Sequence, residues 1–82
     1  MLSECIKCHL EALEISRELK DKKYEAQDLG NLGNAYVEQG DLNKAIECFD
    51  ECIEVYRVVY PGGHPVVDKI KKSKEEVMLK AN

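Results

Sequence analysis

The stretch LGNAYVEQGDLNKAIECFDEC, residues 32–52, decides the fold of this chain. Large and very small residues alternate along two segments with helical spacing, residues 32–39 and 42–52. Gly40 and Asp41 separate the two segments. Gly40 suits the left-handed residue that follows a helix, and Asp41 suits the N-cap of the next helix. Gly33 and Ala45 are small enough to let the two helices approach closely. The stretch therefore predicts a helix-turn-helix hairpin, a unit that stacks on neighbours rather than standing alone.

Apolar residues continue the helical pattern on both sides of this hairpin. They recur every three or four residues, which is the spacing of an amphipathic helix. Pro61, Gly62 and Gly63 interrupt the pattern, and Pro65 is tolerated in the first turn of a helix. We therefore expect four helices, at about residues 1–20, 23–39, 42–60 and 64–80.

Five residues of the hairpin stand at the spacings typical of the tetratricopeptide repeat: Leu32, Gly33, Tyr36, Ala45 and Phe49. From about Ala26 to Val59 the chain resembles one complete repeat of that family, in the longer-period variety found in G-protein-signalling modulators and kinesin light chain. The resemblance implies an all-α fold, in which antiparallel helix hairpins stack as a superhelix, and a function in binding other proteins. Residues 64–80 lack the Leu-Gly pair and the tyrosine, so we expect them to form a capping helix.

The chain also resembles itself at a distance of forty residues. When the sequence is aligned with itself at an offset of forty residues, residues 5–17 align with residues 45–57. Five of the thirteen aligned pairs are identical: Ile6/Ile46, Cys8/Cys48, Glu11/Glu51, Glu14/Glu54 and Arg17/Arg57. Residues 1–20 are therefore expected to be the second helix of a partial repeat that precedes the complete repeat at 23–60. Together with the cap, these segments are expected to form a single domain over residues 1–82.

The composition is that of one small acidic domain. Its 82 residues include 12 basic and 16 acidic side chains, and the net charge of −4 disfavours binding to nucleic acid. No apolar run approaches the roughly 20 residues that span a bilayer, and residues 1–4 lack the order of a signal peptide. We therefore expect a cytoplasmic protein with no membrane partner, whose four cysteines are reduced.

The cysteines raise the alternative of a metal site. Cys5, Cys8 and His9 share one predicted helix, and Cys48 and Cys52 share another, so these side chains could converge on zinc. Against this, Cys5 and Cys52 occupy positions where a small apolar residue beside a neighbouring helix is expected. Nucleophilic catalysis by a cysteine would need a concave pocket that four short helices do not offer. We expect no metal, no cofactor and no enzymatic activity.

Two asparagines are the strongest candidates for a binding site. In the family that the chain resembles, the first helices of successive repeats line a concave groove, and an asparagine at the place of Asn34 binds the backbone or carboxylate of an extended peptide. A carboxamide both donates and accepts hydrogen bonds, so Asn34 and Asn31 can bind a peptide group whatever its side chain. Gln27, Val37 and Glu38 would add selectivity. The alternative is that both asparagines are only solvated residues on an exposed helix face.

A second hypothesis concerns assembly. Leu2, Ile6, Leu10 and Leu13 recur at helical spacing in the first predicted helix. Since this helix lacks the hairpin partner of a complete repeat, its apolar face would be covered by a second copy of the chain or by a neighbouring repeat. The alternative to a module that binds a protein or peptide partner is therefore a self-assembling repeat unit, with a homo-oligomer formed through residues 1–20, or a fragment of a longer scaffold of such repeats.

Overall fold

The computed structural model describes the backbone of residues 2–81 and the side chains of residues 6–81. Four helices make up almost all of this part of the chain: α1 (Leu2–Glu18), α2 (Lys22–Gln39), α3 (Leu42–Val59) and α4 (Pro65–Ala81). Each boundary lies within two residues of the position expected from the sequence pattern. The described residues contain no strand, so the expected all-α fold is confirmed.

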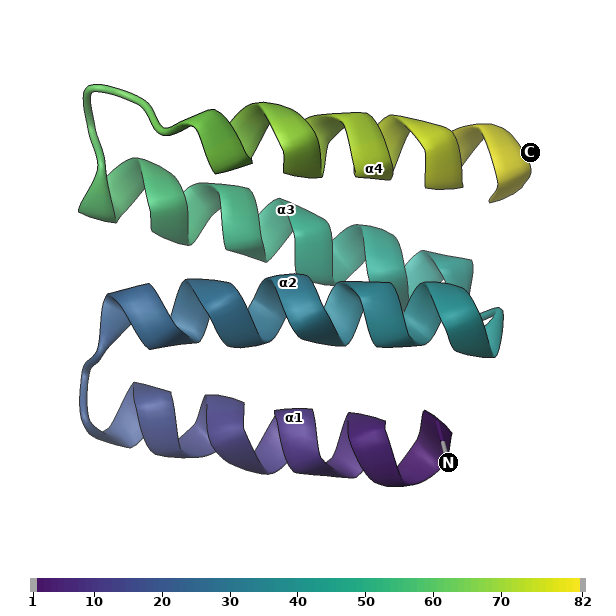
Figure 1. Ribbon diagram of the computed structural model, residues 1–82, viewed down its shortest axis with the longest axis horizontal. Coiled ribbons are helices and arrows are strands. Elements are labelled where there is room, and N and C mark those ends of the chain that lie inside the picture. The colour runs from purple at the N-terminus through teal and green to yellow at the C-terminus, as the bar shows by residue number, and fades with distance from the viewer. Residues whose placement is uncertain (1, 82) are drawn as a thin grey trace.

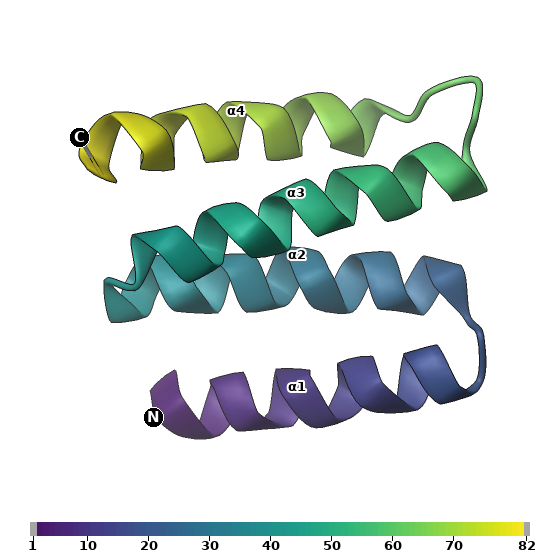
Figure 2. The ribbon, with the colours of Figure 1, turned by 180° about the vertical axis from the view of Figure 1, so that it is seen from behind.

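The helices lie side by side in chain order, each antiparallel to the one before it (Figure 1). Helices α2 and α3 occupy the middle, and α1 and α4 form the two edges, as the reverse view in Figure 2 also shows. The Cα atoms extend over 31 × 28 × 15 Å, and the shortest extent is well above the roughly 5 Å Cα diameter of one helix, so the four helices do not lie in one flat layer. No helix among the described residues is long and apolar enough to cross a membrane.

The turn between α2 and α3 has the geometry that its sequence predicts. Gly40 is in the left-handed conformation with φ of 91°, and its N–H donates to the Val37 carbonyl at 3.1 Å. The N–H of Asp41 donates to the Tyr36 carbonyl at 2.9 Å. The Asp41 carboxylate then accepts from the N–H of Lys44 at 3.4 Å and caps α3. These bonds end one helix and begin the next within two residues.

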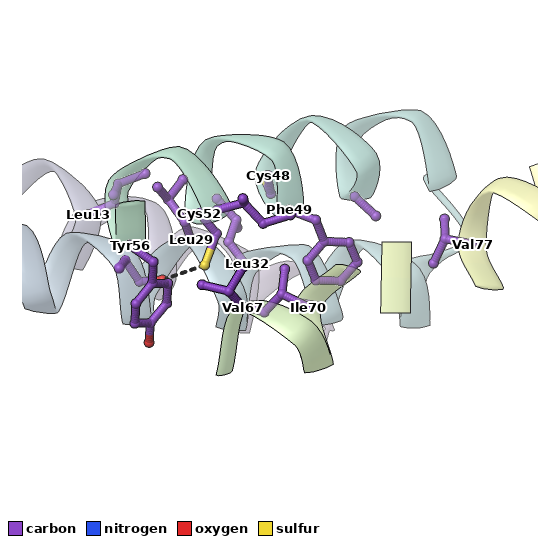
Figure 3. Close-up of a cluster of buried hydrophobic side chains, with 14 of the residues drawn as sticks. Leu13, Leu29, Leu32, Cys48, Phe49, Cys52, Tyr56, Val67, Ile70 and Val77 are labelled. Carbon is purple, nitrogen blue, oxygen red and sulfur yellow. Dashed lines mark hydrogen bonds between the residues drawn. The ribbon is translucent and has the colours of Figure 1, made fainter. Parts of the chain in front are cut away.

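The core lies where α2 and α3 cross. Ala45 and Cys52 of α3 are fully buried and Phe49 is 2% exposed. Figure 3 shows Phe49 and Cys52 within the cluster of buried side chains. Gly33 faces the Phe49 ring so closely that a Cβ at this position would lie 2.6 Å from Phe49 Cε1. The Cys52 thiol donates to the Ala26 carbonyl at 3.1 Å, which satisfies a polar group inside the core. The close approach expected at Gly33 and Ala45 is confirmed.

An aromatic cluster joins α3 to α4. The rings of Tyr56 and Tyr60 have centroids 6.0 Å apart, and the His64 imidazole lies 4.5 Å from Tyr60 and 5.3 Å from Tyr56. His64 Nδ1 accepts from the N–H of Val66 at 3.1 Å, within the first turn of α4. The link from α3 to α4 is therefore held by ring packing and a side-chain hydrogen bond.

The apolar face expected on the first helix differs from the one observed. Ile6 and Leu13 are 8% and 5% exposed because they pack into the core of this chain. Leu10 is 45% exposed, and Leu2 lies outside the described side chains. Ile15, at 56%, is also exposed. The hypothesis that Ile6 and Leu13 leave apolar surface uncovered is therefore wrong, because α2 and its neighbours already cover these two side chains.

Candidate peptide-binding groove

A groove of about 340 Å³ runs between α2 and α4, with α3 as its floor. We call it the α2–α4 groove. It is lined by Ala26, Gln27, Gly30, Asn31, Asn34, Cys52, Tyr56, Val66 and Ile70. Helix α2 supplies the polar wall and α4 the apolar wall, while the floor comes from two buried residues of α3. A small-molecule pocket is usually more enclosed, whereas an open groove with a polar wall suits an extended chain.

The groove continues toward the link between α3 and α4. A second hollow of about 210 Å³ adjoins it and shares four residues with it: Ala26, Gln27, Tyr56 and Val66. Lys23 and His64 also line this second hollow. The two hollows therefore form one path along α2, with carboxamides toward one end and basic side chains toward the other.

Three of the five candidate site residues line this groove. Gln27, Asn31 and Asn34 are exposed on α2, at spacings of four and three residues that place them on one helix face. Within residues 6–81, no hydrogen bond joins the Asn31 or Asn34 carboxamide to another side chain. Both carboxamides are therefore open to solvent and available to a ligand.

The other two candidate residues lie away from the groove. Val37 is partly buried and packs against the core, while Glu38 is exposed near the C-terminal end of α2. Neither is among the residues that line either hollow. Glu38 lies on the same helix face as Asn34 but one turn further along α2, whereas the Val37 side chain is turned toward the core.

The opposite wall of the groove was absent from the sequence-based site. Val66 and Ile70 of α4 form it, although the sequence predicts that α4 only caps the stack. The sequence did contain one indication of this wall: Val66 and Ile70 are four residues apart, the spacing of one helix face, near the start of the helix that begins at Pro65. Their role as a wall depends on how α4 packs across α3, and no residue spacing within α4 reports that packing.

The floor of the groove is electrically neutral at physiological pH. Burial raises the pKa of the Tyr56 phenol above its ordinary value, and burial likewise raises the pKa of the Cys52 thiol to about 11. Both groups therefore remain protonated and add no charge to the floor; the Cys52 thiol already donates to the Ala26 carbonyl, so it contributes only apolar surface. This arrangement can bind an uncharged backbone between the carboxamides of α2 and the aliphatic side chains of α4.

The cysteines are poorly placed for metal or nucleophilic chemistry. Burial raises the pKa of the Cys48 thiol to about 11 as well, and both reactions require a thiolate. Cys8 is exposed on α1, whereas Cys48 and Cys52 are buried, and Cys5 lies outside the described side chains. Among those side chains that are described, no three His, Cys, Asp or Glu residues come together as a metal would require.

Comparison with known proteins identifies the family of this chain. A family model described as tetratricopeptide repeat matches residues 2–57. The heat shock protein sti1 homolog of Schizosaccharomyces pombe is 42% identical over 57 residues, which cover 68% of this chain and 10% of that protein. The chain thus spans about a tenth of the length of this curated relative. No solved structure shows a significant match. The chain therefore belongs to the tetratricopeptide-repeat family, whose helical repeats generally mediate interactions between proteins.

Proposed function

We propose that this protein binds an extended segment of a partner protein in the α2–α4 groove. The observation that carries the proposal is the alignment of Gln27, Asn31 and Asn34 along one wall, opposite Val66 and Ile70. The carboxamides would hydrogen-bond successive peptide groups, and the aliphatic wall would cover apolar side chains of the partner. The module itself would carry out no reaction.

The preformed groove is the physical source of affinity in this proposal. The groove wall stands on α2, which is tied to α3 by the buried contacts of Phe49 and Cys52. Rigid helices need little ordering when a ligand binds, so most of the contact free energy appears as affinity. Binding an extended segment still costs the ordering of that segment, which favours modest affinity and several dispersed contacts.

The basic end of the groove indicates which partner chemistry fits. Lys23 lines the hollow beside His64, and that hollow contains no acidic residue. A carboxylate on the partner, either an acidic side chain or a chain terminus, would gain from the Lys23 ammonium. We therefore propose a segment that carries an acidic group at one end and uncharged residues along the asparagine wall.

The decisive experiment selects peptides from a phage-displayed random library against the wild-type chain and against Asn34→Ala. We expect the wild type to enrich extended sequences with an acidic residue at one end. Asn34→Ala should bind the enriched peptides about 5- to 30-fold more weakly, because a peptide group loses its hydrogen-bond partner. Fluorescence anisotropy with a labelled synthetic peptide gives the dissociation constants.

The matched control is Asn43→Ala, which removes the same side chain from an exposed position in the first turn of α3, outside the groove. It should leave the affinity unchanged. Circular dichroism should show equal helix content in both variants. If the two variants weaken binding equally, or neither does, the proposed contact with Asn34 is wrong.

A further inference from the structure

One ion pair ties the first helix to the third. Arg17 Nη2 on α1 lies 3.0 Å from Glu51 Oε2 on α3, across the end of α2. Arg17 also lies on a hollow of α1 together with Leu10, Leu13, Glu14 and Glu18. This surface of α1 is therefore where α3, the repeat equivalent of α1, makes its polar contact with α1.

Each partner of this ion pair has an equivalent forty residues away in the sequence. These two equivalents lie on different surfaces and are not paired with each other. Arg57 of α3 is the equivalent of Arg17, and Glu11 of α1 is the equivalent of Glu51. Arg57 and Glu11 are both exposed. Within residues 6–81 neither forms an ion pair. The molecule thus presents an arginine at one edge and its complementary glutamate at the other.

Arg57 stands at a hollow that can receive a helix. We call it the α3–α4 groove; its volume is about 580 Å³, and it is lined by Asp50, Ile53, Glu54, Arg57, Lys71, Lys74, Glu75 and Met78. Four of these are the repeat equivalents of residues on the α1 hollow: Asp50, Ile53, Glu54 and Arg57. Apolar Ile53 and Met78 lie among charged groups of both signs, so the groove suits an amphipathic helix with mixed charge.

Within residues 6–81, no other helix covers the matching face of α1. On α3, the face that includes Cys48, Glu51 and Cys52 lies against the preceding helices, and both cysteines are buried. The equivalents on α1 are Cys8, Glu11 and Ala12; Cys8 is exposed and Ala12 partly exposed. Beside them, Ile15 is 56% exposed, whereas its equivalent Val55 packs against the core. This α1 face has the residues of a contact surface without a contact.

We propose that a second copy of this chain docks its α1 into the α3–α4 groove of the first, with Glu11 of one copy paired to Arg57 of the other. The contact between two molecules would then have the same arrangement as the contact between α1 and α3 within one molecule. The proposal goes beyond peptide binding, because it uses the two edges of the molecule rather than the α2–α4 groove. Figure 1 shows that α1 and α4 lie at opposite edges, so the two surfaces cannot meet within one chain.

This contact joins two different surfaces, so it is head-to-tail and leaves one surface of each kind free at the ends of the assembly. Copies should therefore add in an open series rather than stop at a closed dimer. The acidic net charge of −4 per copy opposes growth, whereas the exposed Glu11–Arg57 pair favours it, and salt screens both interactions.

The test is sedimentation velocity over a range of protein concentrations on the 82-residue chain and two charge-reversed variants. Wild type should show an average size that rises with concentration. Glu11→Arg places an arginine opposite Arg57, and Arg57→Glu places a glutamate opposite Glu11. Each variant alone should associate on the order of tenfold more weakly than wild type.

Mixing the two variants supplies the decisive result. Arg57 of the first variant then meets Glu11 of the second, and the two reversed charges also face each other, so the equimolar mixture should recover association. Glu76→Arg is the matched control, because Glu76 is exposed on α4 and does not line the α3–α4 groove. This variant should associate as wild type does.

Three results would overturn the proposal. These are a strict monomer at millimolar wild-type protein, a mixture of variants no larger than either alone, and a closed dimer as the end point. Binding of the selected peptide by the two charge-reversed variants should stay at the wild-type level. That readout separates failure of the assembly contact from failure of the peptide groove.

Discussion

At the scale of single residues, the missing side chain of Gly33 is what allows α2 and α3 to touch. The Phe49 ring occupies the space above Gly33, and three of its carbons would lie within 3.1 Å of an added Cβ. Phe49 is 2% exposed and has no room to move aside. Gly30, one turn earlier on α2, is different, because a Cβ there would lie 3.7 Å from Cys52 Sγ, an ordinary contact.

The two glycines therefore predict opposite effects of the same substitution. Gly33→Ala should lower the free energy of unfolding by about 1–2 kcal/mol, because the cost of overpacking exceeds the gain in helix propensity. Gly30→Ala should raise it by about 0.5–1 kcal/mol, because only the gain in propensity applies. Urea unfolding followed by circular dichroism measures both. A stabilised Gly33→Ala would contradict the close packing of Phe49.

At the scale of the elements, Gly40 and Asp41 determine where α2 ends and α3 begins. The φ of 91° at Gly40 is strained for any residue with a Cβ, and no heavy atom beyond Gly40 and its two chain neighbours lies within 4 Å of the place where that Cβ would be. A substitution at Gly40 therefore tests backbone conformation alone. By contrast, a substitution at Gly33 tests packing.

Gly40→Ala should destabilise the protein by about 1–2 kcal/mol, since an alanine must adopt the left-handed conformation to preserve the turn. Gly40→Asn is the comparison variant and should cost less, because asparagine tolerates that conformation better. Thermal unfolding of both variants gives the difference. Equal midpoints for alanine and asparagine would show that the turn relaxes to another conformation.

At the scale of the whole molecule, Arg17 joins three helices. Its guanidinium contacts Glu51 of α3 at 3.0 Å and Glu25 of α2 at 3.5 Å, and Lys22 also reaches Glu25 at 3.2 Å. The Glu25 side chain is only 8% exposed, so these two cationic side chains replace the solvent that burial removes from it. The pair with Glu51 is about half exposed and contributes less.

Arg17→Ala should lower the free energy of unfolding by about 1–2 kcal/mol, mainly because Glu25 loses one of its two cationic partners while buried. Arg57→Ala removes the repeat-equivalent side chain, which forms no ion pair within the described residues, and should change stability by about 0.5 kcal/mol or less. Urea unfolding is measured in dilute solution, where copies remain separate. Equal losses in both variants would contradict the role of Glu25.

The sequence alone was sufficient for the four helices, their turns and the tight contact at Gly33. Helical periodicity, N-cap residues and a left-handed glycine act over a few neighbouring residues, so their consequences can be derived without coordinates. Gln27, Asn31 and Asn34 were selected as site residues through the family resemblance, and the structure places them together along one wall of the α2–α4 groove. The resemblance also selected Val37 and Glu38, because it does not define where along α2 the groove ends.

Only the tertiary structure decided which surfaces the helices share. The wall formed by Val66 and Ile70, the burial of Ile6 and Leu13, and the ion pair between Arg17 and Glu51 all join residues of different helices. Such contacts depend on how packed side chains set the angle and register between helices. Local sequence specifies what each helix offers to its neighbours, whereas the packing between helices determines which of those faces remain open to a partner.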